Sequence, residues 1–226
     1  MAQKRFLSLS PAGLSALPLA LLLGASLALG GCEWLAMGTE KVIGKEVISN
    51  YPGLIDKSLV IVVYADPATT FEYPAAREEI SAFVTGKFQK TLPSVKLVDY
   101  KDIIRWQDDT FNWQGLPEKD WGRHFSTQRV LYIELLEYST REPGSQDLLR
   151  GRIRATCKVF ETDAPGQTAA WTEQFKVFWP TDMPELASHS NDLAARRRVL
   201  EAFSEQLVNG FYDHREREIP TREKSQ

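Results

Sequence analysis

Three tryptophans lie close together in residues 106–121, among four acidic side chains. Trp106, Trp113 and Trp121 are joined there by Phe111, and the carboxylates are those of Asp108, Asp109, Glu118 and Asp120. Tryptophan rings stack on sugar rings, and two carboxylates can serve as general acid and base across a glycosidic bond. The segment therefore has the residue types of a glycan site, although neighbouring Asp108 and Asp109 would point apart on a strand.

Two other interpretations of this segment stay open. Protein interfaces are enriched in tryptophan and tyrosine, so the segment could dock a partner protein. Aromatic side chains also fill cores, so the plainest interpretation is packing beneath a sheet. We expect packing or docking in preference to catalysis. The candidate partner-binding residues are Trp106, Phe111, Trp113 and Trp121.

A second candidate surface is basic. Four cations share one face of a predicted strand: Arg150, Arg152, Arg154 and Lys158. Lys176 of the next strand could join them, and such a patch would attract an anionic partner or lipid headgroups. A solvated face paired with Glu134 and other acids is the alternative. Arg152 and Arg154 are the candidate partner-binding residues of this surface.

The residues that carry most enzyme chemistry are sparse. No phosphate-binding loop, dinucleotide-binding turn, nucleophile elbow or paired-histidine zinc motif occurs in the sequence. His124, His189 and His214 are far apart along the chain, so we predict no metal site, no cofactor and no enzymatic activity. Cys157 falls on the apolar face of its predicted strand, where a buried thiol is expected.

Hydrophobic periodicity predicts the elements that position these residues. Strands are predicted at 59–64, 95–100, 129–138, 150–158 and 170–179. Helices are predicted at 76–88, at 102–106 with Asp102 as a cap, and at 193–213, whereas 107–128 has the character of a loop. Strands separated by helices should be parallel, and hairpin-linked strands antiparallel. The predicted fold is α/β with an α+β tendency: one mixed sheet of about five strands, parallel in its first half and antiparallel in its second, packed with amphipathic helices.

Composition limits the class of protein. The chain has 226 residues, of which 43% are hydrophobic and 25% charged, as expected of one ordinary globular domain. A net charge of -3 is too close to zero for a typical nucleic-acid binder. Two cysteines cannot staple a small scaffold.

The first 31 residues have the pattern of a secretory signal peptide. Lys4 and Arg5 precede an apolar stretch at 14–23, and small residues follow. Pro18 argues against a membrane-spanning helix, which needs ~20 consecutive apolar residues. The end of the segment, Leu29-Gly30-Gly31-Cys32, resembles the bacterial lipobox, in which the cysteine thiol is alkylated by a diacylglycerol donor. We predict lipidation of Cys32; an ordinary signal peptide with an incidental cysteine is the alternative.

Lipidation would anchor the mature chain to a membrane by its acyl chains. The predicted organisation is a signal peptide at 1–31, an anchored tether at 32–57, the α/β domain at 58–215 and a charged, disordered tail at 216–226. Without Lys4 and Arg5, 25 basic residues face 30 acidic ones, a net charge of -5. Glu33, where an aspartate would favour inner-membrane retention, points to the outer membrane, with the domain facing the periplasm.

The order of elements resembles the α/β domain of the group of bacterial envelope proteins that includes the TolB amino terminus, CsgG and LpoB. The matching segments are 59–63, 95–99, 130–135 and the hairpin 159–175, where Pro165-Gly166 stands in place of the usual Thr-Gly. The resemblance implies a docking or assembly role and supplies no catalytic residues. The β-propeller that follows this domain in TolB is absent, and the 107–128 insertion departs from the usual short connection.

Together these features predict a lipid-anchored accessory or scaffold protein of the bacterial cell envelope that docks a partner protein in the periplasm. One alternative is a CsgG-like pore or secretion-channel subunit, which would need paired segments of about ten residues with one lipid-facing apolar side. Another is a glycan or lipid carrier that uses the tryptophan-rich segment. Homo-oligomerisation stays open, and no nucleic-acid partner is expected.

Overall fold

The computed structural model of the chain describes residues 45–189 and 191–216. Cys32, the predicted signal peptide and nearly all of the predicted tail lie outside these ranges. Residues Ile48–His214 form one compact unit. Separately, β1 (Lys45–Val47) and β8 (His214–Glu216) pair in a two-stranded sheet.

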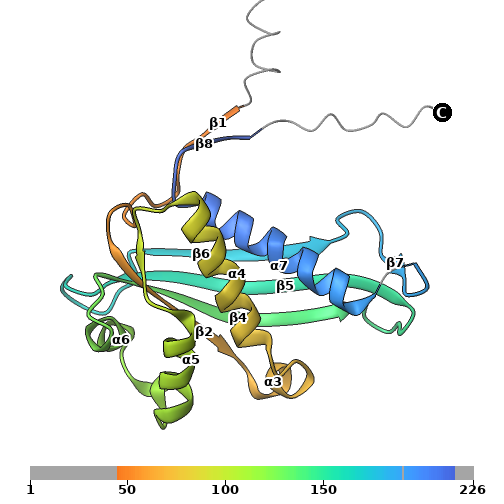
Figure 1. Cartoon of the computed structure of the whole chain (residues 1–226), viewed down its shortest axis with the longest axis horizontal. Helices are drawn as coiled ribbons and strands as arrows, with labels where there is room; N and C mark the ends of the chain where they lie inside the picture. Colours follow the sequence, from red (N-terminus) through yellow and green to blue (C-terminus); the bar gives the residue numbers. More distant parts are fainter. Residues whose placement is uncertain (1–44, 190, 217–226) are drawn as a thin grey trace, which may run out of the picture. The chain divides into compact units, whose positions relative to one another are not determined.

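The compact unit is built on a mixed sheet, as predicted (Figure 1). Its strands are β2 (Ser58–Ala65), β3 (Lys96–Leu97), β4 (Arg129–Arg141), β5 (Leu148–Glu161), β6 (Trp171–Trp179) and β7 (Glu185–Leu186). They lie in the order β3-β2-β4-β5-β6, and β7 pairs with β5. β2 is parallel to β3 and β4, whereas β4, β5 and β6 form an antiparallel meander. The short β7 is the sixth strand, one more than expected.

Two long helices cover one face of the sheet and enclose the larger core. They are α4 (Ala76–Thr91) and α7 (Asp192–Asn209), which lie side by side across the strands (Figure 1). In α4, Ile80, Val84 and Phe88 recur at helical spacing and are fully buried against the sheet. On the sheet side, β5 contributes Ile153, Ala155, Cys157 and Val159, as its alternation predicts.

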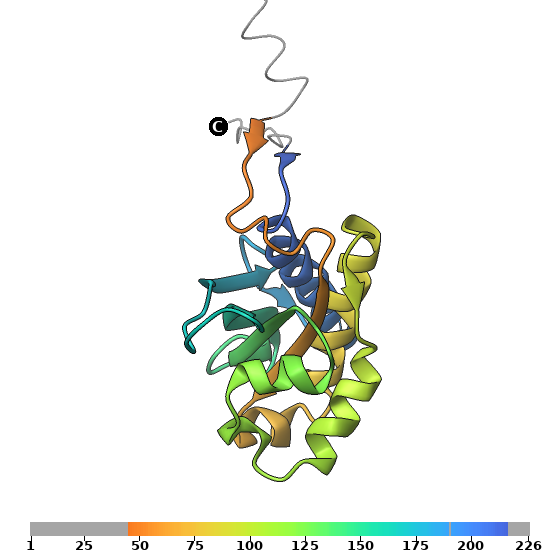
Figure 2. The same ribbon diagram turned by 90° about the vertical axis from the view of Figure 1, so that its left-hand side faces the viewer.

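Shorter helices cover only part of the opposite face. They are α5 (Tyr100–Asp109), the single 3-10 turn η1 (Trp113–Gly115) and α6 (Glu118–His124), which lies in front in the side view of Figure 2. Their apolar side chains enclose a smaller core over β2 and β4 that includes Val60, Val62 and Val130. Farther along β5 and β6, side chains of this face are exposed, among them Arg154 and Lys176. We call this part of the sheet the uncovered face; its charged residues on the two strands are Arg150, Arg152, Arg154, Lys158 and Lys176.

Several local predictions need correction. The segment 107–128 is not a loop, because α5 runs to Asp109 and α6 follows; seven residues are too few for helical periodicity to be recognised. Asp99 caps α5 by accepting a hydrogen bond from the Lys101 amide at 2.9 Å, so Asp102 is not the cap. A further helix, α3 (Pro67–Glu72), follows β2 directly and is capped by Asp66.

The beginning of the domain also differs from the prediction. Residues 48–57 were expected to be tether, yet they belong to the compact unit. Leu54 is fully buried in the larger core, and the Tyr51 hydroxyl donates a hydrogen bond to the Glu161 carboxylate at 2.8 Å. These contacts fix the chain ahead of the first long strand.

Candidate functional site

Most of the tryptophan-rich segment is packed inside the protein. Trp113 and Trp121 are 4% and 2% exposed, and their rings meet edge to face at 5.4 Å. The Trp121 indole N–H donates to the Trp113 carbonyl at 3.2 Å. These two side chains fill the smaller core, as the packing interpretation expects, and little of either ring is left exposed for a sugar to stack on.

The rest of this segment is divided between packing and surface. Trp106 is half-buried and stacks on His124, whereas Phe111 is 100% exposed. Asp108 forms an ion pair with Arg77 at 2.6 Å, and Asp120 pairs with Arg123 in its own helix. Each of these two carboxylates is thus held by an arginine.

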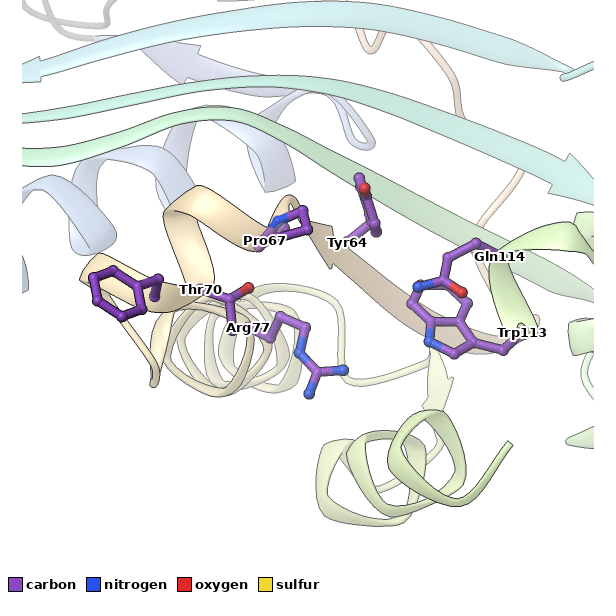
Figure 3. Close-up of a pocket in the computed structure, with 8 residues that line it drawn as sticks. Tyr64, Pro67, Thr70, Arg77, Trp113 and Gln114 are labelled. Atoms are coloured by element: carbon purple, nitrogen blue, oxygen red, sulfur yellow. The ribbon is translucent and has the colours of Figure 1, made fainter. Parts of the chain in front are cut away.

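An open hollow of about 480 Å³ lies at the carboxyl end of β2 (Figure 3). β2 lies between β3 and β4 in the sheet, so the strand order reverses beside it. Open α/β sheets bind ligands at such points, outside the carboxyl ends of the strands. Tyr64, Thr70, Trp113 and Gln114 line the hollow, together with Arg77. Because the Arg77 guanidinium is already paired with Asp108, this lining does not single out one class of ligand.

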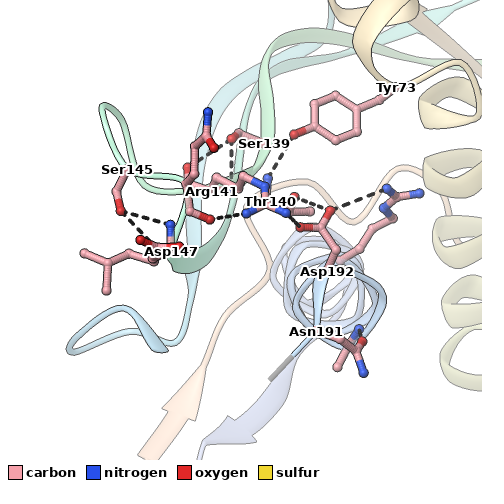
Figure 4. A network of polar contacts seen from close by, with 12 residues as sticks. Tyr73, Ser139, Thr140, Arg141, Ser145, Asp147, Asn191 and Asp192 are labelled. Atoms are coloured by element: carbon pink, nitrogen blue, oxygen red, sulfur yellow. Dashed lines mark hydrogen bonds and ion pairs between the residues drawn. The ribbon is translucent and has the colours of Figure 1, made fainter. Parts of the chain in front are cut away.

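A polar network lies where β4 ends beside the start of α7 (Figure 4). The Thr140 hydroxyl donates to Asp192 at 2.7 Å, and Arg141 forms an ion pair with the same carboxylate at 3.1 Å. The Thr140 amide donates to the Tyr73 hydroxyl at 3.3 Å. The network therefore joins β4 to both α7 and the α3–α4 connection.

Glu79 extends these contacts to α4. It accepts a hydrogen bond from the Tyr138 hydroxyl at 2.7 Å and forms an ion pair with Arg196 of α7 at 3.4 Å. Burial, followed by the hydrogen bond to Glu79, raises the pKa of Tyr138 well above its ordinary value. The phenol therefore stays neutral and donates its proton to Glu79, which suits a structural contact between sheet and helices.

The uncovered face contains the basic residues that the sequence analysis assigned to one face of a strand. Arg152 forms an ion pair with Glu137 at 2.7 Å, and the same carboxylate lies 3.8 Å from Arg154. Lys158 pairs with Glu134 at 3.6 Å. The interpretation of a solvated face paired with acids is therefore confirmed for these three cations.

Pairing does not balance the charge on this face. Four cations share three carboxylates, those of Glu134, Glu137 and Glu142: they are Arg150, Arg152, Arg154 and Lys158. Lys176 is a fifth cation on the same face. Arg154 and Lys176 lie directly opposite each other on β5 and β6. Like charges in directly opposed positions destabilise a sheet. The face is thus positive on a chain that is acidic as a whole.

An aromatic ring lies beside these cations. Phe178 of β6 is half-buried, with the Arg150 guanidinium 4.8 Å and the Lys176 ammonium 5.3 Å from the ring centroid. Such contacts hold the cations without neutralising them. Among the residues that the structure describes, no carboxylate lies within ion-pair distance of Lys176.

Sequence reasoning named Glu134 as an acidic member of this surface but did not identify Glu137. Glu137 reaches Arg152 and Arg154 because an irregularity in β4 shifts the register between Leu135 and Glu137. Strict alternation would have placed Glu137 on the face of Leu135, in the core. The available signal for this bulge was the spacing of Glu134 and Glu137, which lie three residues apart and so break strict alternation.

Other candidate groups are accounted for by burial or separation. Cys157 is fully buried, and burial raises the pKa of its thiol, so it packs as a small apolar side chain. Across 45–189 and 191–216, no cluster of histidine, cysteine and carboxylate side chains could hold a metal ion. Over the same ranges, no helix is both long and apolar enough to cross a membrane.

Comparison with known proteins finds similarity only among solved structures. No family model and no curated protein sequence matches the chain. Protein XCC0632 from Xanthomonas campestris is 14% identical with a TM-score of 0.45, covering 73% of this chain and 90% of its own. Lipoprotein GNA1162 from Neisseria meningitidis is 14% identical with a TM-score of 0.42, covering 67% and 98%. The PelC dodecamer from Paraburkholderia phytofirmans is 12% identical with a TM-score of 0.41, covering 70% and 91%.

Some of these structural neighbours are bacterial lipoproteins, GNA1162 among them. At such identities the likeness concerns the fold alone. It identifies neither a ligand nor a partner of this chain, and the resemblance to TolB, CsgG and LpoB stays a prediction.

Proposed function

We propose that the chain is a lipid-anchored accessory protein of the bacterial cell envelope, which docks an acidic segment of a partner protein on its uncovered face. The anchor is supported by the sequence Leu29-Gly30-Gly31-Cys32 at the end of a signal-like segment. The outer membrane and the periplasm are the proposed location. Anchoring raises the local concentration of the domain near membrane partners without adding a contact.

One observation carries the docking proposal: the direct opposition of Arg154 and Lys176. The Arg154 side chain is 52% exposed, and the carboxylate nearest to it is already shared with Arg152. A partner carboxylate bound between the two cations would relieve their repulsion. Electrostatic complementarity of this kind steers association and selects acidic partners over basic ones.

The protein acts in this proposal by binding and not by catalysis. A glycan carrier would need exposed tryptophans, whereas Trp113 and Trp121 are in the core. The carboxylates of Asp108 and Asp120 are each paired with an arginine. The experiment below also tests the alternative of a pore subunit.

The test is cross-linking in intact cells, followed by capture of the lipidated protein and mass spectrometry. The variant Arg154→Gln/Lys176→Gln should lose an acidic envelope partner that the unaltered protein recovers. The matched control, Lys101→Gln/Arg105→Gln on α5, removes the same charge from two exposed positions and should retain the partner. Equal recovery by both variants would overturn docking at this face, and a ladder of self-oligomers alone would favour the pore.

The anchor is tested separately with Cys32→Ser. This variant should lose metabolic labelling with a radioactive fatty acid and should leave the membrane fraction. Undiminished labelling of the variant would contradict lipidation at Cys32. Failure of this test would leave the test of the uncovered face unaffected, because the two use different residues and readouts.

A further inference from the structure

The strand β6 forms one edge of the six-stranded sheet. It pairs with β5 along all nine residues from Trp171 to Trp179, and no described strand pairs with its other side. The opposite edge, β3, is only two residues long. A long strand with one free row of backbone donors and acceptors is a template for pairing with another strand.

Two of the usual protections of an edge strand, a bulge and a proline, are missing from β6. Its register with β5 contains no bulge, and proline appears only after Trp179. β6 contains two charged side chains, Lys176 on the uncovered face and Glu173 on the face of the larger core. Nine residues in an antiparallel junction would form about eight to ten backbone hydrogen bonds.

The sequence of β6 suits pairing with itself. Trp171 and Trp179 end the strand at equal distances from Phe175, its central residue. When two copies align antiparallel about Phe175, each Trp171 faces the Trp179 of the other copy. Two-fold contacts require this kind of self-complementary surface.

The remaining pairs in this alignment are also compatible. Thr172 would face Phe178, Glu173 would face Val177, and Gln174 would face Lys176, so no like charges are directly opposed. Trp171 and Trp179 are half-buried at the margin of the larger core, and pairing would cover them further. We propose that a second copy of this chain pairs with β6 in this register and continues the sheet across a two-fold axis.

The helix layer has room for such a pair. α7 packs on both β5 and β6 (Figure 1). With strands about 4.8 Å apart, the two copies of α7 would lie about 10 Å apart, within the usual spacing of packed helices. On α7, Arg198 lies over the Trp179 ring at 5.9 Å and lines a hollow of about 370 Å³ with Ala194 and Glu201. Glu201 already forms ion pairs within α7, with Arg197 at 2.9 Å and Arg198 at 3.5 Å.

Disulfide cross-linking of the full-length protein in cell membranes tests the register. In the proposed pair, residue 172 of one copy lies opposite 178 of the other, at a Cα separation of ~5 Å that a disulfide can span. The double variant Thr172→Cys/Phe178→Cys should form a dimer on oxidation, whereas each single variant should stay monomeric on a non-reducing gel. Cys157 is fully buried and should not contribute.

The matched control is Thr172→Cys/Gln174→Cys, whose cysteines do not face each other in this register. Equal dimer in this control, or no dimer from Thr172→Cys/Phe178→Cys while circular dichroism shows the fold intact, would overturn the proposal. If the cysteine variants fail to fold, Gln174→Glu and Gln174→Lys provide a second measurement. Placed opposite Lys176, the glutamate should tighten dimerisation and the lysine should weaken it, each by about threefold to tenfold in sedimentation equilibrium.

Equal affinity for these two variants would also contradict the proposal. Neither the disulfide nor the sedimentation experiment involves the envelope partner. Failure of self-pairing can therefore be distinguished from failure of the proposed docking.

Discussion

Arg154 and Lys176 lie directly opposite each other on β5 and β6, on the part of the sheet that the described helices leave uncovered. Folding would be favoured if one of these positions were neutral or acidic. The other face of the same strands contains Ala155 and Val177, which are buried in the larger core. The fold therefore requires the apolar residues of these strands but not the two cations.

Replacing Lys176 with glutamine should stabilise the protein while weakening partner binding. The substitution removes the repulsion from Arg154 and leaves the contact of Arg154 with Glu137 unchanged. The free energy of unfolding in urea should rise by about 0.2–1 kcal/mol. A variant that was less stable, or one that kept full partner recovery, would contradict a docking role for this cation.

Truncation should affect stability strongly at Trp121 and hardly at all at Phe111, although the two residues belong to the same short segment. Trp121→Ala would leave a cavity in the smaller core and should lower the free energy of unfolding by about 3–5 kcal/mol. Phe111→Ala alters a fully exposed side chain and should change it by less than ~0.5 kcal/mol. Urea unfolding of both variants, followed by tryptophan fluorescence for Phe111→Ala and by circular dichroism for Trp121→Ala, makes the comparison.

Gly151 allows α7 to pack closely on the sheet, and Gly86 in α4 serves as a control. A Cβ atom on Gly151 of β5 would lie 2.7 Å from the Val199 Cβ and 2.8 Å from the Ala195 carbonyl oxygen. Gly151→Ala should therefore push α7 from the sheet and cost about 1–3 kcal/mol. Gly86→Ala in α4 meets nothing within 4 Å and should stabilise by about 0.5–1 kcal/mol. Thermal unfolding would show a lower midpoint for the first variant and a higher one for the second.

Ionisation of Tyr51 should destabilise the protein at high pH. Burial, followed by the hydrogen bond to Glu161, raises the pKa of Tyr51 to about 12 from its model-compound value of 10.0. The unfolded chain therefore releases this proton first, so the contribution is complete below pH ~10 and is lost as the pH rises toward ~12. Tyr51→Phe should flatten this part of the stability profile, measured by urea unfolding at successive pH values. An unchanged slope would show that Tyr51 is not the group responsible.

The sequence predicted those parts of the fold in which one periodicity persists over many residues. The alternation of β5 correctly assigned Ile153 and Cys157 to the core and Arg152 to the other face. Short elements were missed because seven residues, as in α6, cannot establish a helical period. Lys119 also obscured the helical pattern of α6, because a lysine is normally expected on the solvent side. In the structure it is 1% exposed, and its ammonium donates a hydrogen bond to the Ala164 carbonyl at 2.7 Å.

The candidate site was predicted less well than the fold. Residue type alone cannot tell a buried tryptophan from an exposed aromatic anchor, because both interiors and interfaces favour aromatic rings. Burial of Trp113 depends on contacts with Tyr64 and Trp121, which lie in other elements. The basic face was recognised correctly, since its residues alternate within one strand.

The position of β2 between β3 and β4 has a consequence for the order in which the protein can fold. β2 pairs with β4, its longer neighbour, only after more than sixty intervening residues have been synthesised, from Leu59 to Arg129. β4, β5 and β6 are successive hairpin partners and can assemble from local contacts. The apolar run from Leu59 to Val63 is thus synthesised early but can pair with β4 only late. During that interval it is the segment of the sheet most prone to aggregate.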